Sequence, residues 1–405
     1  MISAWFGRGS AITAMAFLAV ACHDSPSGLK KTGGGTSTFS DSMYATAVVD
    51  RPPLGADVAG TWGGLTLLVG SDQSVHIFSA DTWDNRLRYA ACDTGCDQLG
   101  SWATVTVDSL TTLSLMPSIS AVMTSGGVTV VGSTRGSASA LRIATCDTGC
   151  TRAVNWQAAS IFSGGIISND GLGRSTPLAA DAGGGLHLVF GNGANQNLEY
   201  AECATACLTE GNWQTVTVDT AAATWFAKQV AVDAGGRVHA VYQRADSLLT
   251  YATCASACTT AASWHTATID PTKYAFGYGG GYNGVSIAFG TGGTVHVAYV
   301  ARDSVKYARC DSLCGTGGVW SVSSLGRQSA DAALAIDGSG ILHLATNWGS
   351  VAVATCANAC ATPANWLTVK ADSVVGGNYV TMGLDATGHE RVASSSLYLQ
   401  YTRIK

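Results

Sequence analysis

The cysteines form the most regular set of reactive side chains in this sequence. Twelve of the 13 cysteines fall into C-x3-C pairs, and a Trp follows each second Cys six residues later. Such thiol pairs can bind a metal or form a disulfide. A structural zinc site needs four ligands, and pairs on separate repeats would lie too far apart to share one ion. Disulfides are therefore predicted for Cys92/Cys96, Cys146/Cys150, Cys203/Cys207, Cys254/Cys258, Cys310/Cys314 and Cys356/Cys360.

Histidines recur at one position of a second motif, D-x-x-G-x-[VL]-H and its degenerate forms. A ring of imidazoles could bind a metal. In three repeats, however, an Asp lies six residues before the His, and a local hydrogen bond between them would brace the turn. We therefore interpret these residues as structural and predict neither a metal nor another cofactor. The histidines are His76, His187, His239, His296 and His343, and the aspartates are Asp181, Asp233 and Asp337.

Both motifs lie between alternating apolar residues, which is typical of β-hairpins. The segment LEYAECATACLTEGNWQTVTVD carries the Cys motif, and PLAADAGGGLHLVF carries the His motif. Each repeat thus predicts four strands, named A to D. The spacing between repeat tryptophans runs from 46 to 57 residues, and a four-strand unit of about this length is a propeller blade. The content of 49 Gly and only 12% charged residues suits many short strands.

The first hairpin occurs seven times, whereas the Cys hairpin occurs six times. The chain ends on residues 399–402, which align with residues 87–90. Residues 44–50 (YATAVVD) match residues 102–108 (WATVTVD), with Tyr44 in place of Trp102. We therefore predict an all-β fold, a seven-bladed β-propeller of four-stranded blades, in which N- and C-terminal strands close one blade.

The repeat also resembles known families. The Trp after the C–D turn is similar to that of the sialidase Asp-box (S-x-D-x-G-x-x-W), and residues 93–95 and 147–149 (both DTG) match its D-x-G core. Similar Trp-bearing blades occur in bacterial propeller lectins. The resemblance covers an architecture, so it implies a propeller fold and only weakly an activity.

Function is expected where the repeat breaks. The A–B and C–D turns of a propeller share one face, which leaves the D–A and B–C loops on the opposite face. These loops are irregular and rich in aromatic residues, so we predict a ligand-binding surface there, for carbohydrate or for an envelope or protein ligand. The alternative is that the rings pack long loops onto the blades. The predicted ligand-binding residues are Trp62, Trp83, Asp84, Arg86, Asn192, Trp225, Arg244, Tyr278, Tyr282, Arg302, Asp303, Asn347 and Trp348.

An enzyme of sialidase type would need three arginines, a Tyr with a Glu partner, and an Asp acid on the channel face. The chain has four Glu, of which three lie in or beside a Cys hairpin and Glu390 lies near a turn of the same face. Asp84 and Asp303 could act as glycosidase carboxylates only at the required separation. No Ser-His-Asp motif, phosphate loop or nucleophile elbow is present. The sequence favours a non-catalytic protein and leaves catalysis open.

The N-terminus predicts export. Residues 1–21 carry Arg8 and an apolar run too short to span a membrane, which indicates a signal peptide. The run ends at LAVAC, which resembles a bacterial lipoprotein signal and implies lipidation of Cys22, although cleavage at an ordinary site is the alternative. Residues 22–43 are predicted to be a flexible tether and residues 44–405 the propeller. The expected location is the outer membrane, facing the periplasm or the cell surface, or the medium.

Two functions of different class follow. The first is a non-catalytic, monomeric binding propeller, and the second is a sialidase-like glycoside hydrolase or lyase. Convergence of Arg86, Arg244 and Arg302 on a carboxylate would favour the second. A third, purely structural envelope protein would lack a concave aromatic pocket. With a net charge of −5 and no basic run, nucleic acid is not an expected partner, and membrane contact is expected only through the lipid anchor.

Overall fold

The computed structural model describes the propeller portion of the chain. The described residues are 44–50, 64–81, 86–109, 119–133, 140–162, 178–192, 194–220, 228–244, 246, 248–272, 284–329, 331–347, 350–370, 379–395 and 399–404. The predicted signal peptide, Cys22 and tether lie outside them. Within this part of the chain, no helix is long and apolar enough to cross a membrane.

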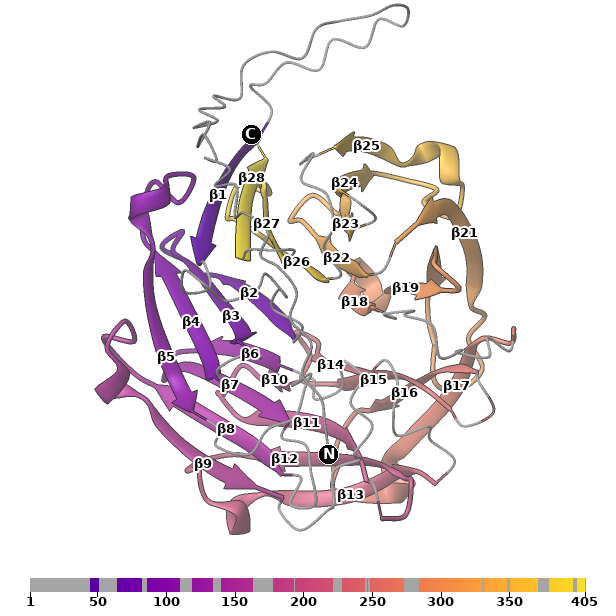
Figure 1. The fold of residues 1–405 in the computed structure, drawn as a ribbon. Coiled ribbons are helices and arrows are strands. Elements are labelled where there is room, and N and C mark those ends of the chain that lie inside the picture. Colours follow the sequence, from indigo (N-terminus) through magenta and orange to yellow (C-terminus); the bar gives the residue numbers. More distant parts are fainter. Residues whose placement is uncertain are drawn as a thin grey trace, which may run out of the picture. The chain divides into compact units, whose positions relative to one another are not determined.

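The fold is a seven-bladed β-propeller, as predicted, and each blade is a four-stranded antiparallel sheet (Figure 1). From the inner to the outer strand, blades 1 to 3 contain β2 (Leu65–Val69), β3 (Val75–Asp81), β4 (Arg86–Cys92) and β5 (Ala103–Ser109); β6 (Ile119–Thr124), β7 (Gly127–Ser133), β8 (Leu141–Cys146) and β9 (Gln157–Ile161); β10 (Leu178–Ala180), β11 (Leu186–Gly191), β12 (Leu198–Cys203) and β13 (Gln214–Asp219). Blades 4 and 5 contain β14 (Lys228–Val232), β15 (Val238–Gln243), β16 (Leu249–Cys254) and β17 (Trp264–Asp270); β18 (Val285–Phe289), β19 (Val295–Ala301), β20 (Ser304–Cys310) and β21 (Ser321–Gln328). Blades 6 and 7 contain β22 (Ala332–Ile336), β23 (Leu342–Asn347), β24 (Val351–Cys356) and β25 (Leu367–Lys370); β26 (Tyr379–Leu384), β27 (Glu390–Ser395), β28 (Leu399–Ile404) and β1 (Tyr44–Asp50).

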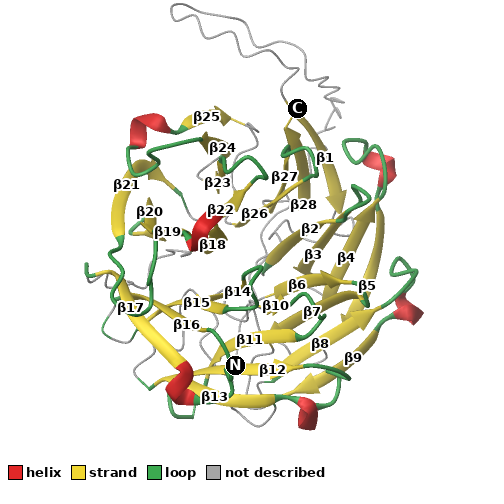
Figure 2. Cartoon of the chain, turned by 180° about the vertical axis from the view of Figure 1, so that it is seen from behind, coloured by secondary structure: helices red, strands yellow, loops and turns green. Residues whose placement is uncertain are grey.

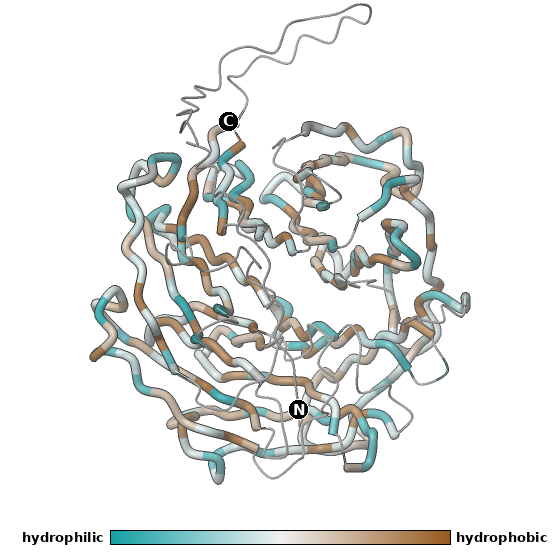
Figure 3. The backbone as a smooth tube through the Cα atoms, viewed as in Figure 1, coloured by the Kyte–Doolittle hydropathy of each residue, from teal (hydrophilic) through white to brown (hydrophobic). Residues whose placement is uncertain are grey.

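The seven inner strands follow one another around a central channel. Each inner strand contacts the inner strand of the next blade, and β26 of blade 7 contacts β2 of blade 1, so the ring closes. Apolar residues (brown in Figure 3) run along the strands, and hydrophilic residues concentrate at turns. Seven apolar clusters fill the spaces between neighbouring blades. The core is therefore divided into layers between blades, because every sheet is apolar on both faces.

Blade 7 is closed by both ends of the propeller sequence, as the alignment predicted. β1 pairs with β28, and Ala47 lies opposite Tyr401 just as Val105 lies opposite Tyr89 in blade 1. The pairing shifts by one residue before Asp50, as it does before Asp108 in the equivalent strand. The match of residues 44–50 to residues 102–108 therefore extends to the irregularity in the pairing.

The last residue of several outer strands links its blade to the next. Asp50 accepts hydrogen bonds from Arg88 at 3.0 and 3.1 Å, and Asp108 accepts one from Arg142 at 2.8 Å. In blade 4, Tyr242 takes the corresponding role and donates to Asp219 of blade 3 at 2.6 Å. The terminal strand β1 thus contributes an ion pair across the seam between blades 7 and 1, in addition to its place in a sheet.

All six cysteine pairs form disulfides within their own hairpins, as predicted, and each bridge joins the end of the third strand to the turn that follows it. The bridges are Cys92–Cys96, Cys146–Cys150, Cys203–Cys207, Cys254–Cys258, Cys310–Cys314 and Cys356–Cys360. The alternative of a metal bound by these thiols is thereby excluded, because both sulfur atoms of every pair are used in a bridge.

The repeat Trp explains the rest of the Cys motif, because its indole N–H donates to the carbonyl of the second Cys. In Trp156 this bond to Cys150 is 2.8 Å long. The same bond recurs from Trp102 to Cys96, Trp213 to Cys207, Trp264 to Cys258, Trp320 to Cys314 and Trp366 to Cys360. A one-turn helix spans residues between the second Cys and the Trp in five of the hairpins, and these helices lie at the periphery (red in Figure 2).

The same Trp packs against the preceding blade. Tyr89 of blade 1 lies 5.3 Å from Trp156 of blade 2, and Tyr401 of blade 7 lies 5.2 Å from Trp102 of blade 1, both measured between ring centroids. Blades 3, 4 and 5 present a Tyr to the next Trp in the same way, and at the interface of blades 2 and 3 Phe162 contacts Trp213 instead. The predicted role of these Trp residues in packing between blades is confirmed.

The motif histidines are structural, as predicted. Asp181, Asp233 and Asp337 each meet the His six residues later, at 3.2 to 3.4 Å between carboxylate oxygen and ring nitrogen. In four blades, the other ring nitrogen is hydrogen-bonded to the hydroxyl of the same Tyr that packs on the next Trp. Burial lowers the pKa of His239 to about 4, and Asp233 only partly offsets this effect, so this imidazole is neutral.

His343 differs, because blade 6 has no Tyr at the equivalent position. Its Nδ1 lies 2.7 Å from Glu390 of blade 7, and its Nε2 lies 3.4 Å from Asp337. Burial alone would lower the pKa of His343, but the two carboxylates outweigh burial and raise it above its usual value. A charged group thus joins blade 6 to the blade that closes the ring.

Removing residues 44–50 should destabilise the protein far more than the loss of a short terminal segment. A chain that starts at residue 51 loses the outer strand of blade 7 and the Asp50–Arg88 ion pair, and it exposes the edge of β28. We expect the free energy of unfolding to fall by at least ~3 kcal/mol relative to a chain that starts at residue 44. Chemical denaturation of the two chains measures this difference, and equal stabilities would contradict the closure by both termini.

The interface of blades 6 and 7 should weaken as pH rises. Because the pKa of His343 is raised on folding, the native state binds more protons than the unfolded state above about pH 6.5, and stability is lost as pH rises through the folded pKa. A Glu390→Gln variant should lose much of this dependence. Melting temperatures of both proteins from pH 5 to 9 test the prediction, and parallel curves would exclude the His343–Glu390 pair as their origin.

Candidate functional site

A polar pocket of about 300 Å³ lies at one end of the central channel. It is lined by the first residues of all seven inner strands, from Gly64 in blade 1 to Tyr379 in blade 7. The chain enters each inner strand at this end, so every segment that connects two blades joins the propeller here. This is the face opposite the disulfide hairpins, where the sequence predicted ligand binding.

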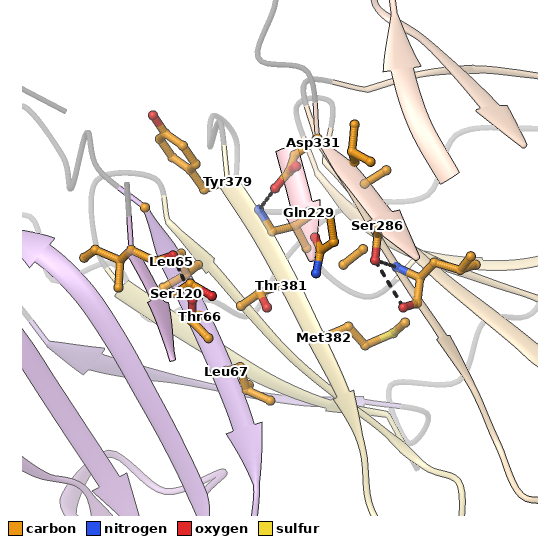
Figure 4. Close-up of a pocket in the computed structure, with 18 of the residues that line it drawn as sticks. Leu65, Thr66, Leu67, Ser120, Gln229, Ser286, Asp331, Tyr379, Thr381 and Met382 are labelled. Carbon is orange, nitrogen blue, oxygen red and sulfur yellow. Dashed lines mark hydrogen bonds between the residues drawn. The ribbon is translucent and has the colours of Figure 1, made fainter. Parts of the chain in front are cut away.

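Hydroxyl groups on the inner strands bind the free edge of the next inner strand. Ser286 Oγ accepts from the N–H of Leu334 at 2.9 Å and donates to its carbonyl at 3.2 Å. Ser120 forms the same pair of bonds with Leu178, and Thr66 Oγ1 donates to the carbonyl of Ile119. An inner strand has a neighbouring strand on one side only, so these hydroxyls satisfy backbone groups that would otherwise face the channel (Figure 4).

The seam between blades 6 and 7 uses a carboxylate for the same purpose. Asp331 is 3% exposed, and its Oδ2 accepts from the N–H of Val380 at 2.8 Å. The carboxylate packs against Gly284, where a Cβ atom would overlap Asp331 Oδ1. Glycine at position 284 is therefore required by the close approach of the carboxylate, which serves the backbone of blade 7.

Lys228 and Gln229 open the inner strand of blade 4 and differ in environment. Lys228 is 3% exposed, and burial lowers its pKa to about 7. Side chains alternate along a strand, so Gln229 faces the opposite side and is partly exposed at the pocket. In the described part of the chain, neither the Gln229 amide nor the Thr381 hydroxyl of blade 7 has a hydrogen-bond partner.

The predicted ligand-binding residues fall into two groups. The first group lies outside the described residues: Trp62, Trp83, Asp84, Trp225, Tyr278, Tyr282 and Trp348. The second group lies at the ends of the second and third strands. Arg86 begins β4 and is exposed, and Arg302 and Asp303 form a two-residue turn in which both have positive φ.

The remaining three residues serve the fold. Asn192 Oδ1 accepts from the N–H of Ala194 and stabilises its own turn. Arg244 lies 3.6 Å from Asp219, the carboxylate that also accepts from Tyr242. Asn347 is 2% exposed and donates to the carbonyl of Tyr379 at 3.3 Å, so it positions the pocket wall. None of the described members of the predicted set lines the pocket itself.

The disulfide cysteines take no part in this pocket. Each first cysteine ends a third strand, and each second cysteine lies in the turn at the opposite end of its blade. The second cysteines serve the fold through their carbonyls, which accept from the repeat Trp, and they are Cys96, Cys150, Cys207, Cys258, Cys314 and Cys360. Their predicted role is therefore confirmed as structural, and the candidate site lies elsewhere.

The residues that do line the pocket were missing from the sequence-based prediction. Thr66, Ser120, Gln229, Ser286 and Thr381 occupy equivalent places in their strands, and polar residues there break the apolar pattern of a buried strand. That break was the available signal. It is weak, because a single polar residue in a short strand is also typical of a side chain that faces solvent.

A second cavity, of about 460 Å³, lies beside the turns of blade 3. Its titratable groups are bonded to one another, since Tyr200 donates to Glu202 at 2.8 Å and lies 2.6 Å from His187. Across the ranges that the structure describes, no group of three His, Cys, Asp or Glu side chains is arranged to hold a metal ion.

No protein-family model and no curated protein sequence matches this chain. Solved structures do match it. The virginiamycin B lyase from Staphylococcus aureus is 10% identical, with 89% of this chain and 99% of that chain covered and a TM-score of 0.53. The Aleuria aurantia lectin is 11% identical (81% and 95% covered, TM-score 0.46), and the NanB sialidase from Streptococcus pneumoniae is 10% identical (88% and 70% covered, TM-score 0.46). At such identities the similarity concerns the fold alone.

Replacing Ser286 by Ala should show how much the inner hydroxyls contribute to the ring. The change leaves the N–H and the carbonyl of Leu334 without their protein partner, so we expect a loss of about 1–2 kcal/mol in the free energy of unfolding. Ser304→Ala is the matched control, because Ser304 bonds only to the Ser324 hydroxyl at an exposed position. Equal effects of the two changes in chemical denaturation would contradict the role of Ser286.

Proposed function

We propose that this chain is an exported, non-catalytic propeller that binds carbohydrate at the end of the channel opposite its disulfide hairpins. The observation that carries the proposal is the polar pocket formed by the first residues of all seven inner strands. Its volume of about 300 Å³ lies at the lower limit for ligand pockets, which suits a single sugar ring better than an extended ligand.

The pocket wall has the chemistry that a sugar requires. Hydroxyl and amide side chains both donate and accept hydrogen bonds, as sugar hydroxyls do. Aromatic residues stand next to the wall in the sequence: Trp62 and Tyr282 each precede a pocket glycine, Gly64 or Gly284, by two positions. Two residues span at most about 7 Å, so these rings are available to cover the apolar face of a bound sugar.

The arrangement of charged residues favours binding over catalysis. Arg86, Arg244 and Arg302 belong to blades 1, 4 and 5, and none of them lines the pocket. Arg244 is engaged by Asp219. A sialidase-like site would require the three guanidinium groups to converge on one carboxylate of the substrate.

The cysteine chemistry supports export. Six disulfides persist only in an oxidising compartment, and their hairpins also hold the Trp residues that pack between blades. Lipidation at Cys22 would attach the propeller to the outer membrane through residues 23–43. The proposed location is the periplasm or the cell surface.

A glycan array tests the proposal with the purified protein of residues 22–405. We expect the wild type to bind, and we expect a Trp83→Ala/Trp348→Ala double variant to lose that binding while its melting temperature stays within about 3 °C, because loop positions contribute little to the core. His265→Ala, which removes an exposed ring from the outer strand β17, is the control and should bind normally. Unfolding of the double variant would mean that these rings pack the loops, and absence of wild-type binding would refute the proposed function.

A further inference from the structure

The inner strands place one equivalent side chain from each of six blades around the pocket. The position lies two residues before the one that pairs with the motif His or its replacement. Five of the six residues are polar and one is alanine. They are Thr66, Ser120, Gln229, Ser286, Ala333 and Thr381.

These polar groups divide into two sets. Thr66, Ser120 and Ser286 are bonded to the backbone of the next inner strand and are committed to the fold. Gln229 and Thr381 have no hydrogen-bond partner within the described ranges, although both are partly exposed at the pocket. Figure 4 shows the Gln229 amide and the Thr381 hydroxyl turned into the space between the inner strands. The structure thus leaves two polar groups available to a ligand.

The chemistry of these two groups restricts the ligand. A primary amide and a hydroxyl each donate and accept, so a ligand that satisfies them must also do both. Sugar hydroxyls meet this condition, whereas carboxylate and sulfate oxygens only accept. Gln229 belongs to blade 4 and Thr381 to blade 7, so the two groups reach the pocket from different directions around the channel. A ring with hydroxyls along its rim can meet both at once.

The charges near the pocket do not favour an acidic sugar. The Asp331 carboxylate is buried and accepts from Val380, and its negative charge would repel an anion. Lys228 is buried on the other side of its strand from Gln229, and its pKa of about 7 leaves much of it uncharged at neutral pH. The wall offered to a ligand is neutral or slightly negative.

We propose that Gln229 and Thr381 select a neutral, polyhydroxylated sugar ring that enters the channel end-on. The inference rests on the proposed carbohydrate binding and deepens it, because it assigns the hydrogen-bonding residues and the class of sugar. Aromatic residues of the connecting segments would then contribute contact area, and these two side chains would contribute selectivity.

Titration calorimetry with free sugars tests the assignment. The neutral probes are glucose, galactose, mannose and N-acetylglucosamine, and the acidic probes are glucuronic acid and N-acetylneuraminic acid. We expect the wild type to bind at least one neutral probe and no acidic probe. Gln229→Leu and Thr381→Val keep the side-chain size and remove the polar groups, so each should weaken binding at least tenfold, about 1.4 kcal/mol. Ser321→Ala, an exposed serine on the outer strand β21, should bind as the wild type does.

The outcomes separate the two proposals. If the Trp83→Ala/Trp348→Ala variant loses sugar binding but Gln229→Leu and Thr381→Val bind normally, carbohydrate binding stands and the assignment of these residues is overturned. Preference for an acidic probe overturns the class of sugar. If neither the array nor any probe is bound by the wild type, both proposals fail. Melting temperatures of the variants within a few degrees of the wild type would show that a loss of binding is local.

Discussion

The packing of a Tyr from one blade on the Trp of the next is the contact on which the rest of the structure depends. Tyr200 is fully buried, its ring lies 5.0 Å from that of Trp264, and its hydroxyl is bonded to His187. The indole N–H of Trp264 in turn donates to the carbonyl of Cys258 inside a disulfide hairpin. Each such pair contributes about 0.5–1.5 kcal/mol beyond the area it buries. A turn, two blades and a cross-linked loop are thereby connected through adjacent side chains, and the connection recurs around the ring.

The exceptions show that this contact is a unit. Blade 2 has Thr129 where other blades have His and Ile143 where they have Tyr, and Phe162 supplies the ring for Trp213. Blade 6 keeps His343 but has Val353 in place of Tyr, and Glu390 of blade 7 takes over the hydrogen bond. Blade 7 has Arg391 in place of His, and Asp385 accepts from it at 2.6 Å. A buried polar group requires a partner, so loss of one member is accompanied by replacement of another.

The sequence predicted most of the fold because the fold is repetitive. Identical Cys and Trp spacing identified the hairpins, and the match of residues 44–50 to residues 102–108 predicted even the strand that closes the ring. The site was predicted less well. The face was identified by exclusion, yet of its proposed residues Asn347 is buried and Asn192 stabilises its own turn. Whether a polar side chain faces a ligand or the next strand depends on distances between blades. Ser286 and Gln229 occupy equivalent positions with different partners, and the pattern of one strand does not distinguish them.

The propeller therefore separates its two tasks by face. Disulfide hairpins and His-bearing turns assemble the ring on one side, and the starts of the inner strands form a polar pocket on the other. Hydrogen exchange of the protein with and without a sugar identified on the array tests this separation most directly. The account predicts slower exchange at the starts of the inner strands, residues 64–67, 228–229 and 379–382, with no change in the disulfide hairpins. Slower exchange in the hairpins, with none at the inner strands, would contradict it.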